Sequence, residues 1–372
     1  MPASVLEALR RFLPEFLQSG PPLFPEQRRA IWAITHCRTP ALGAQLFVCK
    51  KCGRQHFAFH SCNHKACPLC GRAATARWVH RELRKLVNAP YFLVTFTLPA
   101  QLRDAFFGPL AKEAYDLFFA AVAGALSEKL ATDKSLRAHV HGFTAALHTW
   151  NQQMGFHPHI HCLVPGAGLD VRGQPVRVKS PKFLVYLPHL QAAFRQHLYR
   201  LLKEHHWQVD PALWDKQWGV HIQPAGAGAS ALKYLGIYVA RTAISDSRIL
   251  KVSNQSVTFR WKNRAKGNRF EISTVPGVEF VRRYLRHVLP RGLRSIRYYG
   301  FCHPAAKASR LRVQFHTGLA VQFGADWQPL AAPSWQPRCP HCGGDVRLLL
   351  TLTAPYRKRG PPQRPTSIPI AA

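Results

Sequence analysis

The sequence predicts an α+β protein in which a cysteine-rich N-terminal region precedes alternating strands and helices. Three observations support this class. Cysteine pairs occur at the spacing of zinc ligands, β-branched and aromatic runs lie between prolines and glycines, and other segments repeat apolar residues at helical spacing. With 372 residues, the chain is long enough to bury one large core or two moderate ones.

The elements are expected in a definite order. Val5, Leu9, Phe12 and Phe16 repeat at helical spacing and predict a first helix, which Pro14 would kink. A basic helix at 72–87 and a buried strand at 91–99 follow. Further along we expect a helical segment at 104–131 broken near a Gly-Pro pair, strands at 142–154 and 157–168, a helix at 188–204, a hinge at 226–230, a helix at 231–244, a strand meander at 248–273 and a Pro-rich basic tail from 354.

These elements divide into four expected regions. N-terminal helices would occupy 1–35, a zinc-binding domain 36–75 and the main α+β domain 76–325. A last cysteine knuckle and the basic tail would fill 326–372.

The charge points to a polyanionic partner. The chain has 51 Lys and Arg against 18 Asp and Glu, a formal net charge of +33. Self-repulsion of this size favours binding to a nucleic acid, and an anionic membrane surface is the weaker alternative. The longest apolar run, 117–126, is too short to span a bilayer, and charges interrupt the N-terminal segment where a signal peptide would be apolar. We therefore expect a cytoplasmic protein associated with the nucleoid.

The cysteines predict metal binding rather than disulfides. Two Cys-x-x-Cys-Gly knuckles lie close to the spacing that delivers four thiolates to one structural zinc ion, and their residues are Cys49, Cys52, Cys67 and Cys70. Cys37, Cys62 and nearby histidines leave open a second zinc ion or a changed ligand set. A third knuckle, with Cys339 and Cys342, has no adjacent partner pair and could be a zinc site or a plain turn.

The stretch "GFHPHIHCLVPGAG" (155–168) carries the most informative histidines. His159 and His161 alternate with Ile160 in a predicted strand, so both imidazoles share one face of the sheet. Two imidazoles there can hold a divalent ion whose open positions accept a phosphate oxygen. A second His-x-His, at 139–141, is followed at once by glycine and has no such strand.

A paired tyrosine motif supplies a candidate nucleophile. Tyr234 and Tyr238 stand at i and i+4 with Arg241 at i+7, so the three share one helix face. Such aromatic stripes usually belong to a core, but a face shared with arginine argues against simple burial. A tyrosine that attacks DNA forms a phosphotyrosine ester and conserves the bond energy, and the absence of any Gly-Lys dipeptide excludes a P-loop.

Taken together, these motifs resemble the HUH superfamily of single-strand nucleases. Within it, the chain is most similar to the two-tyrosine rolling-circle transposases of the insertion-sequence ninety-one family, from about Leu23 to Gly300. The similar blocks are "HCRTPALG", the cysteine knuckles, "FTLP", "LHTWNQ", "HPHIHCLVPGAGL", "KYLGIYVARTAIS", "VTFRWK" and "FVRRYLRHVLPRGLRSIRYYG". Two positions depart from the family pattern: Ile237 replaces an arginine between the tyrosines, and Ala66 replaces a histidine before the second knuckle.

The resemblance implies a fold, an activity and its residues. It implies a central antiparallel RRM-like sheet flanked by helices, with His159 and His161 on a central strand. These histidines would bind Mg²⁺ or Mn²⁺, while Tyr234 and Tyr238 would attack single-stranded DNA at element ends and remain attached to its 5′ side. Expected DNA contacts are Lys233, Arg241 and Arg248, and expected partners are element ends, target DNA and host helicase or replication proteins.

HUH enzymes add a third ligand to the histidine pair. Gln152 lies opposite His159 if the hairpin turns at about 154–158, and its neutral amide suits a site that must accept an anionic phosphate. His148 is the alternative ligand, and a purely structural role for Gln152 also stays open.

Four rival functions are weighed against this interpretation. A plasmid replication initiator or a conjugative relaxase would use the same site. A non-catalytic zinc-containing DNA-binding regulator would need no paired tyrosines, and a carboxylate-triad transposase fits poorly with the scattered Asp and Glu.

Overall fold

The computed structural model of the chain describes residues 3–215, 218–227, 232, 236, 242–263, 265–318 and 337–354, without the side chains of 72–74 and 227. The fold is α+β with antiparallel sheets, as the sequence predicts. The helices are α1 (Val5–Ser19), α2 (Pro25–Thr35), α3 (Gly71–Leu83), α4 (Ala111–Thr132), α5 (Leu187–Glu204), α7 (Gly277–Leu285) and α8 (Lys307–His316). The strands are β1 (Gly43–Cys49), β2 (Gln55–Phe59), β3 (Pro90–Thr97), β4 (Gly142–Trp150), β5 (Phe156–Pro165), β6 (Ala167–Leu169), β7 (Pro175–Arg177), β8 (Gly219–Ala227), β9 (Ile249–Val252), β10 (Ser256–Asn263), β11 (Arg269–Pro276), β12 (Ile296–Gly300) and β13 (Val346–Thr353).

The largest sheet has the order β12-β4-β5-β3-β8, and every neighbouring pair is antiparallel. β5 is therefore the middle strand, which agrees with the expected central position of the histidine strand. β4 and β5 form a hairpin whose turn is closed by the side chain of Asn151, because its Oδ1 accepts the N–H groups of Gln153 at 3.0 Å and Gly155 at 2.8 Å. This closure ends β4 at Trp150.

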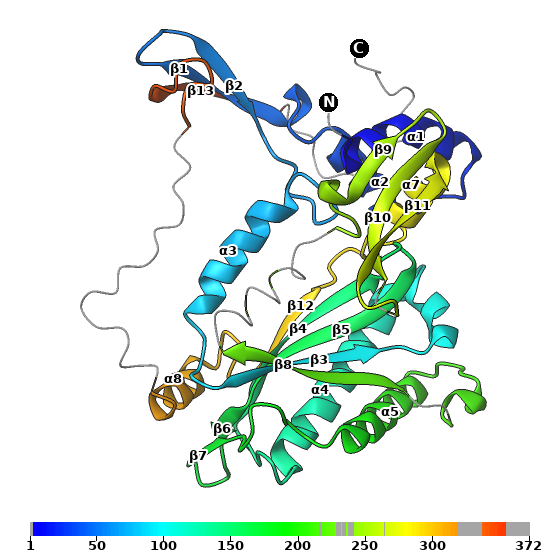
Figure 1. The fold of residues 1–372 in the computed structure, drawn as a ribbon, viewed down its shortest axis with the longest axis vertical. Coiled ribbons are helices and arrows are strands. Elements are labelled where there is room, and N and C mark those ends of the chain that lie inside the picture. Colours follow the sequence, from blue (N-terminus) through cyan, green and yellow to red (C-terminus); the bar gives the residue numbers. More distant parts are fainter. Residues whose placement is uncertain are drawn as a thin grey trace.

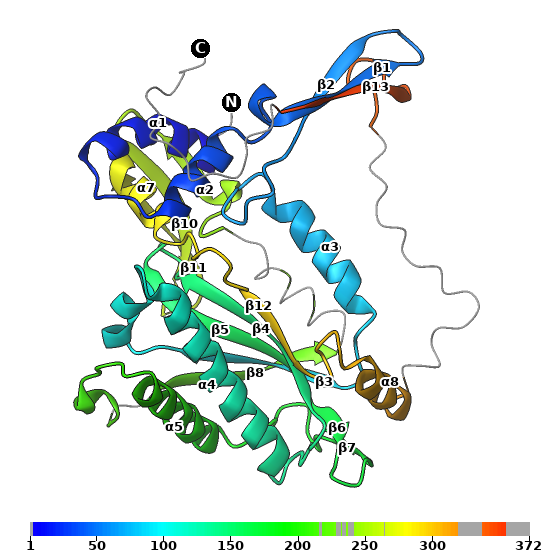
Figure 2. The same ribbon diagram turned by 180° about the vertical axis from the view of Figure 1, so that it is seen from behind.

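Helices α4 and α5 cover one face of this sheet (Figure 2). α4 is apolar nearly all round, which suits a helix buried between the sheet and α5. Phe118 of α4 and Phe194 of α5 are fully buried against Phe92 and Phe96 of β3. The main hydrophobic core lies here and leaves the opposite face of the sheet for other contacts.

On the opposite face, residues of α3 and α8 share a smaller hydrophobic cluster with β3, β4 and β5, and both helices lie to one side of the sheet (Figure 1). Trp78 of α3 is buried there, and its indole Nε1 donates to the hydroxyl of Tyr298 on β12 at 2.8 Å. That hydroxyl donates in turn to the buried carboxylate of Glu82 at 3.1 Å, which also pairs with Lys85 at 2.9 Å. This polar chain fixes α3 to the edge of the sheet.

A second hydrophobic core joins α1, α2 and α7 to the β11-β10-β9 sheet. Val5, Leu9 and Phe12 of α1 are buried, as their helical spacing predicts, and Ser4 caps the helix by accepting the N–H of Glu7. The helices lie behind this sheet in Figure 1 and in front of it in Figure 2, so they cover only one of its faces.

A third sheet, β13-β1-β2, projects from the rest of the molecule (Figure 1). β13 comes from the C-terminal segment, and it pairs with β1 from Gly43↔Thr353 to Cys49↔Val346. The sequence predicts a separate region from residue 326, whereas β13 pairs with a strand of the N-terminal zinc region. A hinge is expected at 226–230, but Gly226 and Ala227 are the last residues of β8. Residues 228–231 lie outside the described residues. Among the described helices, none is long and apolar enough to cross a membrane.

Candidate metal centres and active site

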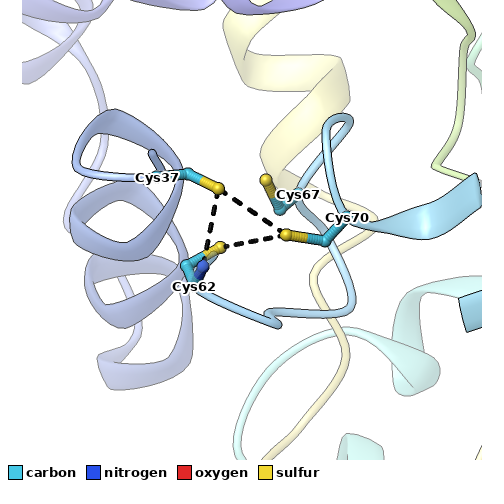
Figure 3. A group of neighbouring side chains, drawn as sticks. All are labelled: Cys37, Cys62, Cys67 and Cys70. Atoms are coloured by element: carbon cyan, nitrogen blue, oxygen red, sulfur yellow. Dashed lines mark hydrogen bonds between the residues drawn. The ribbon is translucent and has the colours of Figure 1, made fainter. Parts of the chain in front are cut away.

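The first cysteine group combines one knuckle with two upstream cysteines. Its members are Cys37, Cys62, Cys67 and Cys70, whose sulfurs all lie within 4.8 Å of one another. The sulfurs face a common centre just after α2 (Figure 3). The Cys70 sulfur lies 3.6 Å from that of Cys37 and 3.7 Å from that of Cys62, close to the separation of about 3.8 Å in a tetrahedral Zn–S₄ site.

The second cysteine group joins the two ends of the chain. Its members are Cys49, Cys52, Cys339 and Cys342, again within 4.8 Å of one another. The sulfurs of Cys49 and Cys342 lie 3.5 Å apart, and those of Cys52 and Cys339 lie 3.7 Å apart. The backbone N–H of Cys52 lowers the pKa of Cys49 to about 6, whereas the pKa of Cys342 in the same group is raised to about 11.

The structure corrects the grouping that sequence spacing predicts. Cys49 and Cys52 do not share a site with Cys67 and Cys70, because each knuckle completes its four sulfurs with a different pair. Pairing of β1 with β13 brings the third knuckle beside Cys49, so the C-terminal pair is part of a metal-type site and not a plain turn. The available signal was the unmatched knuckle itself, but its partner could not be read from local spacing.

The replacement at Ala66 leaves the first group complete. Four sulfurs are present without a side chain from this position. The carbonyl of Ala66 accepts a hydrogen bond from Tyr284 of α7 at 2.6 Å, which ties the knuckle to the second core.

Three histidines meet on the face of the central sheet opposite α4 and α5. His159 and His161 come from β5, and His148 comes from β4 directly opposite His159. One nitrogen of each ring lies within 4.8 Å of the others, and the group contains no carboxylate among the described residues. His148 and His161 are buried and His159 is half-buried, so water has limited access to the group.

Neighbouring atoms orient the histidine rings. Nδ1 of His159 lies 2.7 Å from the carbonyl oxygen of His157, which can only accept, so this nitrogen carries the proton and Nε2 has the lone pair. Nδ1 of His161 lies 2.9 Å from the hydroxyl of Thr95 on β3. The ring of His148 stacks on Trp150 with a centroid distance of 4.7 Å. Partners of this kind fix the ring orientation of histidines that bind metals.

The expected register of Gln152 is wrong. His148, not Gln152, lies opposite His159, because the turn begins at Asn151 and not near residue 154. Gln152 follows the end of β4 with an exposed side chain, and its backbone carbonyl accepts a hydrogen bond from Arg248. The third position of the histidine group is therefore occupied by the alternative residue, His148.

The predicted nucleophiles lie outside the described residues, as do Lys233 and Arg241. Two described neighbours of Tyr234 and Tyr238 can be located. Leu232 is helical and buried in the cluster on the histidine face of the sheet, together with Ala146, the cross-strand partner of His161. Gly236 is also helical, and a Cβ at this position would lie 2.5 Å from Val79 of α3, so glycine permits this close approach.

Arg248 connects two elements beside the histidine group. Its Nε donates to the carbonyl of Arg260 on β10 at 2.9 Å, and a second guanidinium nitrogen donates to the carbonyl of Gln152. The expected role of Arg248 in DNA binding stays a prediction, and its contacts join β10 to the β4–β5 turn.

Two further histidines near the group are held neutral. Burial, and then the charge of Arg103, lower the pKa of His157 to about 4. Burial also lowers the pKa of His287 to about 4, and this residue bridges Thr149 at 3.1 Å and the carbonyl of Met154 at 3.0 Å. Neither residue belongs to the group of three.

Comparison with known proteins assigns the chain. Residues 8–98 match a family described as "Transposase zinc-binding domain", and residues 142–310 match one described as "Putative transposase". The "Putative transposase y4qJ" of Sinorhizobium fredii is 37% identical over 318 residues, which cover 80% of this chain and 79% of that protein. The chain belongs to the insertion-sequence ninety-one family of transposases.

A second relative of this transposase is also named a transposase. The "Transposase for insertion sequence element IS801" of Pseudomonas savastanoi pv. phaseolicola is 27% identical over 283 residues, covering 71% of this chain and 67% of that protein. No solved structure matches. The zinc-binding match contains the first cysteine group, whereas Cys339 and Cys342 lie outside both matched ranges.

Proposed function

We propose that this transposase cuts and rejoins single-stranded DNA at element ends through 5′-phosphotyrosine linkages, along a rolling-circle route. The observation that carries the proposal is the convergence of His148, His159 and His161 on one face of the central sheet. Leu232, next but one to Tyr234 in the chain, packs in the hydrophobic cluster on the same face. A metal site and a tyrosine segment on one face are what attack on a phosphodiester requires.

The histidine group fits a divalent metal ion. Three imidazole nitrogens with oriented rings would hold it, and the bound ion would polarise a non-bridging oxygen of the scissile phosphate. Mg²⁺ prefers oxygen ligands, so a site of nitrogen donors favours Mn²⁺ of the two expected ions. The two cysteine groups would each hold a structural Zn²⁺.

The chemistry then falls to the tyrosines. The phenol oxygen of Tyr234 or Tyr238 forms a bond to phosphorus, and the bond from phosphorus to the 3′ oxygen breaks. The phenol loses its proton, and the leaving 3′ oxygen gains one. Attack by a new 3′ hydroxyl on the phosphotyrosine reverses these changes and rejoins the strand, so no nucleotide cofactor is consumed.

The test is adduct formation on a single strand. The full chain is incubated with an oligonucleotide carrying an element end and with Mn²⁺, and covalent protein–DNA products are separated under denaturing conditions. His159→Ala and His161→Ala should each abolish the adduct while binding to the oligonucleotide persists.

The chain offers its own matched control for this test. His139 belongs to the other His-x-His motif and is exposed, so His139→Ala should form adducts normally. Adducts at the normal rate from both His159→Ala and His161→Ala, or nicking without any covalent product, would contradict the proposal.

A further inference from the structure

The β11-β10-β9 sheet has one face that no described element covers. Its inner face buries Val257 and Phe259 against α1 and α7. The helices lie on that side only (Figures 1 and 2). We call the opposite side the outer face, and it consists of Lys251, Thr258, Arg260, Lys262, Phe270, Ile272 and Thr274, which the register brings side by side.

The outer face combines exposed apolar groups with cations. Phe270 is 60% exposed and Ile272 is 67% exposed, so neither contributes to a core. The guanidinium carbon of Arg260 lies 5.3 Å from the Phe270 ring centroid, and Nζ of Lys262 lies 5.5 Å from it. Both cations therefore lie over a ring that is still largely open to solvent.

The positive charge of the outer face is not neutralised locally. Within the described part of the chain, Lys251, Arg260 and Lys262 form no ion pair with a carboxylate. Glu271 lies between Phe270 and Ile272 in the chain, but alternation places it opposite Trp261 on the other face. There it pairs with Lys266 at 3.1 Å and accepts from Asn263 at 3.0 Å.

The outer face is also connected to the histidine group. Arg248 donates to the carbonyls of both Arg260 and Gln152, so β10 is joined to the turn that directly follows β4. β4 carries His148 just before that turn. Through these contacts the outer face is joined to the strand that carries one of the three histidines.

We infer that the outer face binds the single-stranded DNA that flanks the cleavage site. An unpaired base stacks on Phe270, while Lys251, Arg260 and Lys262 contact the neighbouring phosphates. Stacking requires an open base face, which single strands offer and duplexes hide. The inference rests on the proposed function for the identity of the strand, but binding can be measured without any chemistry.

The first test replaces the aromatic ring. Binding of the full chain to a fluorescent oligothymidylate and to a duplex of equal length is followed by fluorescence anisotropy, without added Mn²⁺. Phe270→Ala should weaken single-strand binding about tenfold, the size of one lost base stack, and should leave duplex binding unchanged. Phe315→Ala removes a phenylalanine that is 68% exposed on α8 and should change neither.

A second variant reports stacking directly. Phe270→Trp should keep the affinity of the natural chain. The oligothymidylate should quench its indole fluorescence more strongly than it quenches that of the natural chain, whose nine tryptophans supply the background, and the duplex should show no such difference. Because Phe270 is exposed, both variants should fold, and circular dichroism and thermal melting check this.

The third test addresses the cations. Arg260→Gln combined with Lys262→Gln should lower the slope of log K against log salt by about 1.4 for single strands, the value for two lost phosphate contacts. Lys134→Gln combined with Lys182→Gln, two exposed lysines beside α4 and α5, is the matched control and should leave the slope unchanged.

Two results would overturn the inference. The first is that Phe270→Ala binds single strands as tightly as the natural chain does. The second is that Phe270→Ala loses the same factor in affinity for single strands and for the duplex. Failure of the proposed chemistry would leave all these binding results intact, so the two proposals fail separately.

Discussion

The identity of the third residue in the histidine group depends on where one hairpin turns. Gly155 and Pro158 are both common in turns and favour a turn near residue 154. The side chain of Asn151 closes the turn earlier, and Pro158 lies inside β5 instead. The alternation of His159 and His161 could be predicted from the sequence, because it is local. The cross-strand partner could not, since moving the turn by a few residues changes every pairing.

The register leads to a prediction for His148. His148→Ala should lower the rate of Mn²⁺-dependent nicking about 100-fold and raise the Mn²⁺ concentration needed for half activity by a similar factor. Loss of a residue that only supports a metal ligand costs about 10- to 100-fold in metal affinity or activity, and loss of a ligand itself should cost at least the upper value. Nicking of a single-stranded element end during a Mn²⁺ titration measures both.

Gln152→Ala is the matched control, because its side chain is exposed and, among the described residues, its hydrogen bond to Arg248 is made by the backbone carbonyl. It should behave as the natural chain. A nearly inactive Gln152→Ala beside a normal His148→Ala would return the third position to Gln152.

At the scale of elements, local patterns predicted the helices and strands better than their partners. The apolar spacing in α1 and the β-branched run in β3 depend on neighbours in sequence, and both elements form as expected. The pairing of β1 with β13 joins residues about 300 positions apart and has no local signature. Local spacing therefore identifies the cysteines as candidate metal ligands but predicts the wrong groups.

The two cysteine groups predict two zinc ions per chain. Cys62→Ser and Cys342→Ser should each leave one zinc ion, and Cys49→Ser combined with Cys67→Ser should lose both because the pair damages both groups. Elemental analysis of purified, folded protein measures the ratio.

Cys302→Ser serves as the control, since Cys302 lies outside both groups and should leave two zinc ions in place. A full complement of zinc in Cys342→Ser would show that the second group is not a metal site.

The contact between His287, which lies just after α7, and the β4–β5 turn predicts a pH dependence. Burial lowers the pKa of His287 to about 4, against about 6.5 in an unfolded chain. Between these values the unfolded state binds a proton that the folded state does not, so stability is complete above about pH 6.5 and falls as the pH drops toward 4. The thermal midpoint of His287→Gln should therefore decline less between pH 7 and pH 5 than that of the natural chain.

Both proteins keep the same thiolates and the same His157, so the difference between their curves isolates His287. Parallel curves over this range would mean that His287 does not stay neutral in the folded state.

At the scale of the whole molecule, the charge of +33 and the zinc-binding and transposase matches agree with a protein that binds DNA. It has two kinds of candidate metal site, the two cysteine groups and the histidine group. The chain brings its C-terminal strand back to the N-terminal sheet, while the histidine group lies on the central sheet between them in sequence. The nucleic-acid partner could be anticipated from composition and the family from its ordered motifs. The assembly of the second cysteine group required the three-dimensional structure, because only long-range pairing creates it.

The most direct test of the central claim identifies the residue that carries the DNA. The transposase is incubated with a single-stranded element end and Mn²⁺, the covalent product is digested, and the nucleotide-bearing peptide is sequenced by mass spectrometry. The account predicts attachment at Tyr234 or Tyr238, adducts from either single Phe variant, and none from Tyr234→Phe combined with Tyr238→Phe, which still binds DNA. A nucleotide on any other residue, or adducts at the normal rate from the double variant, would contradict it.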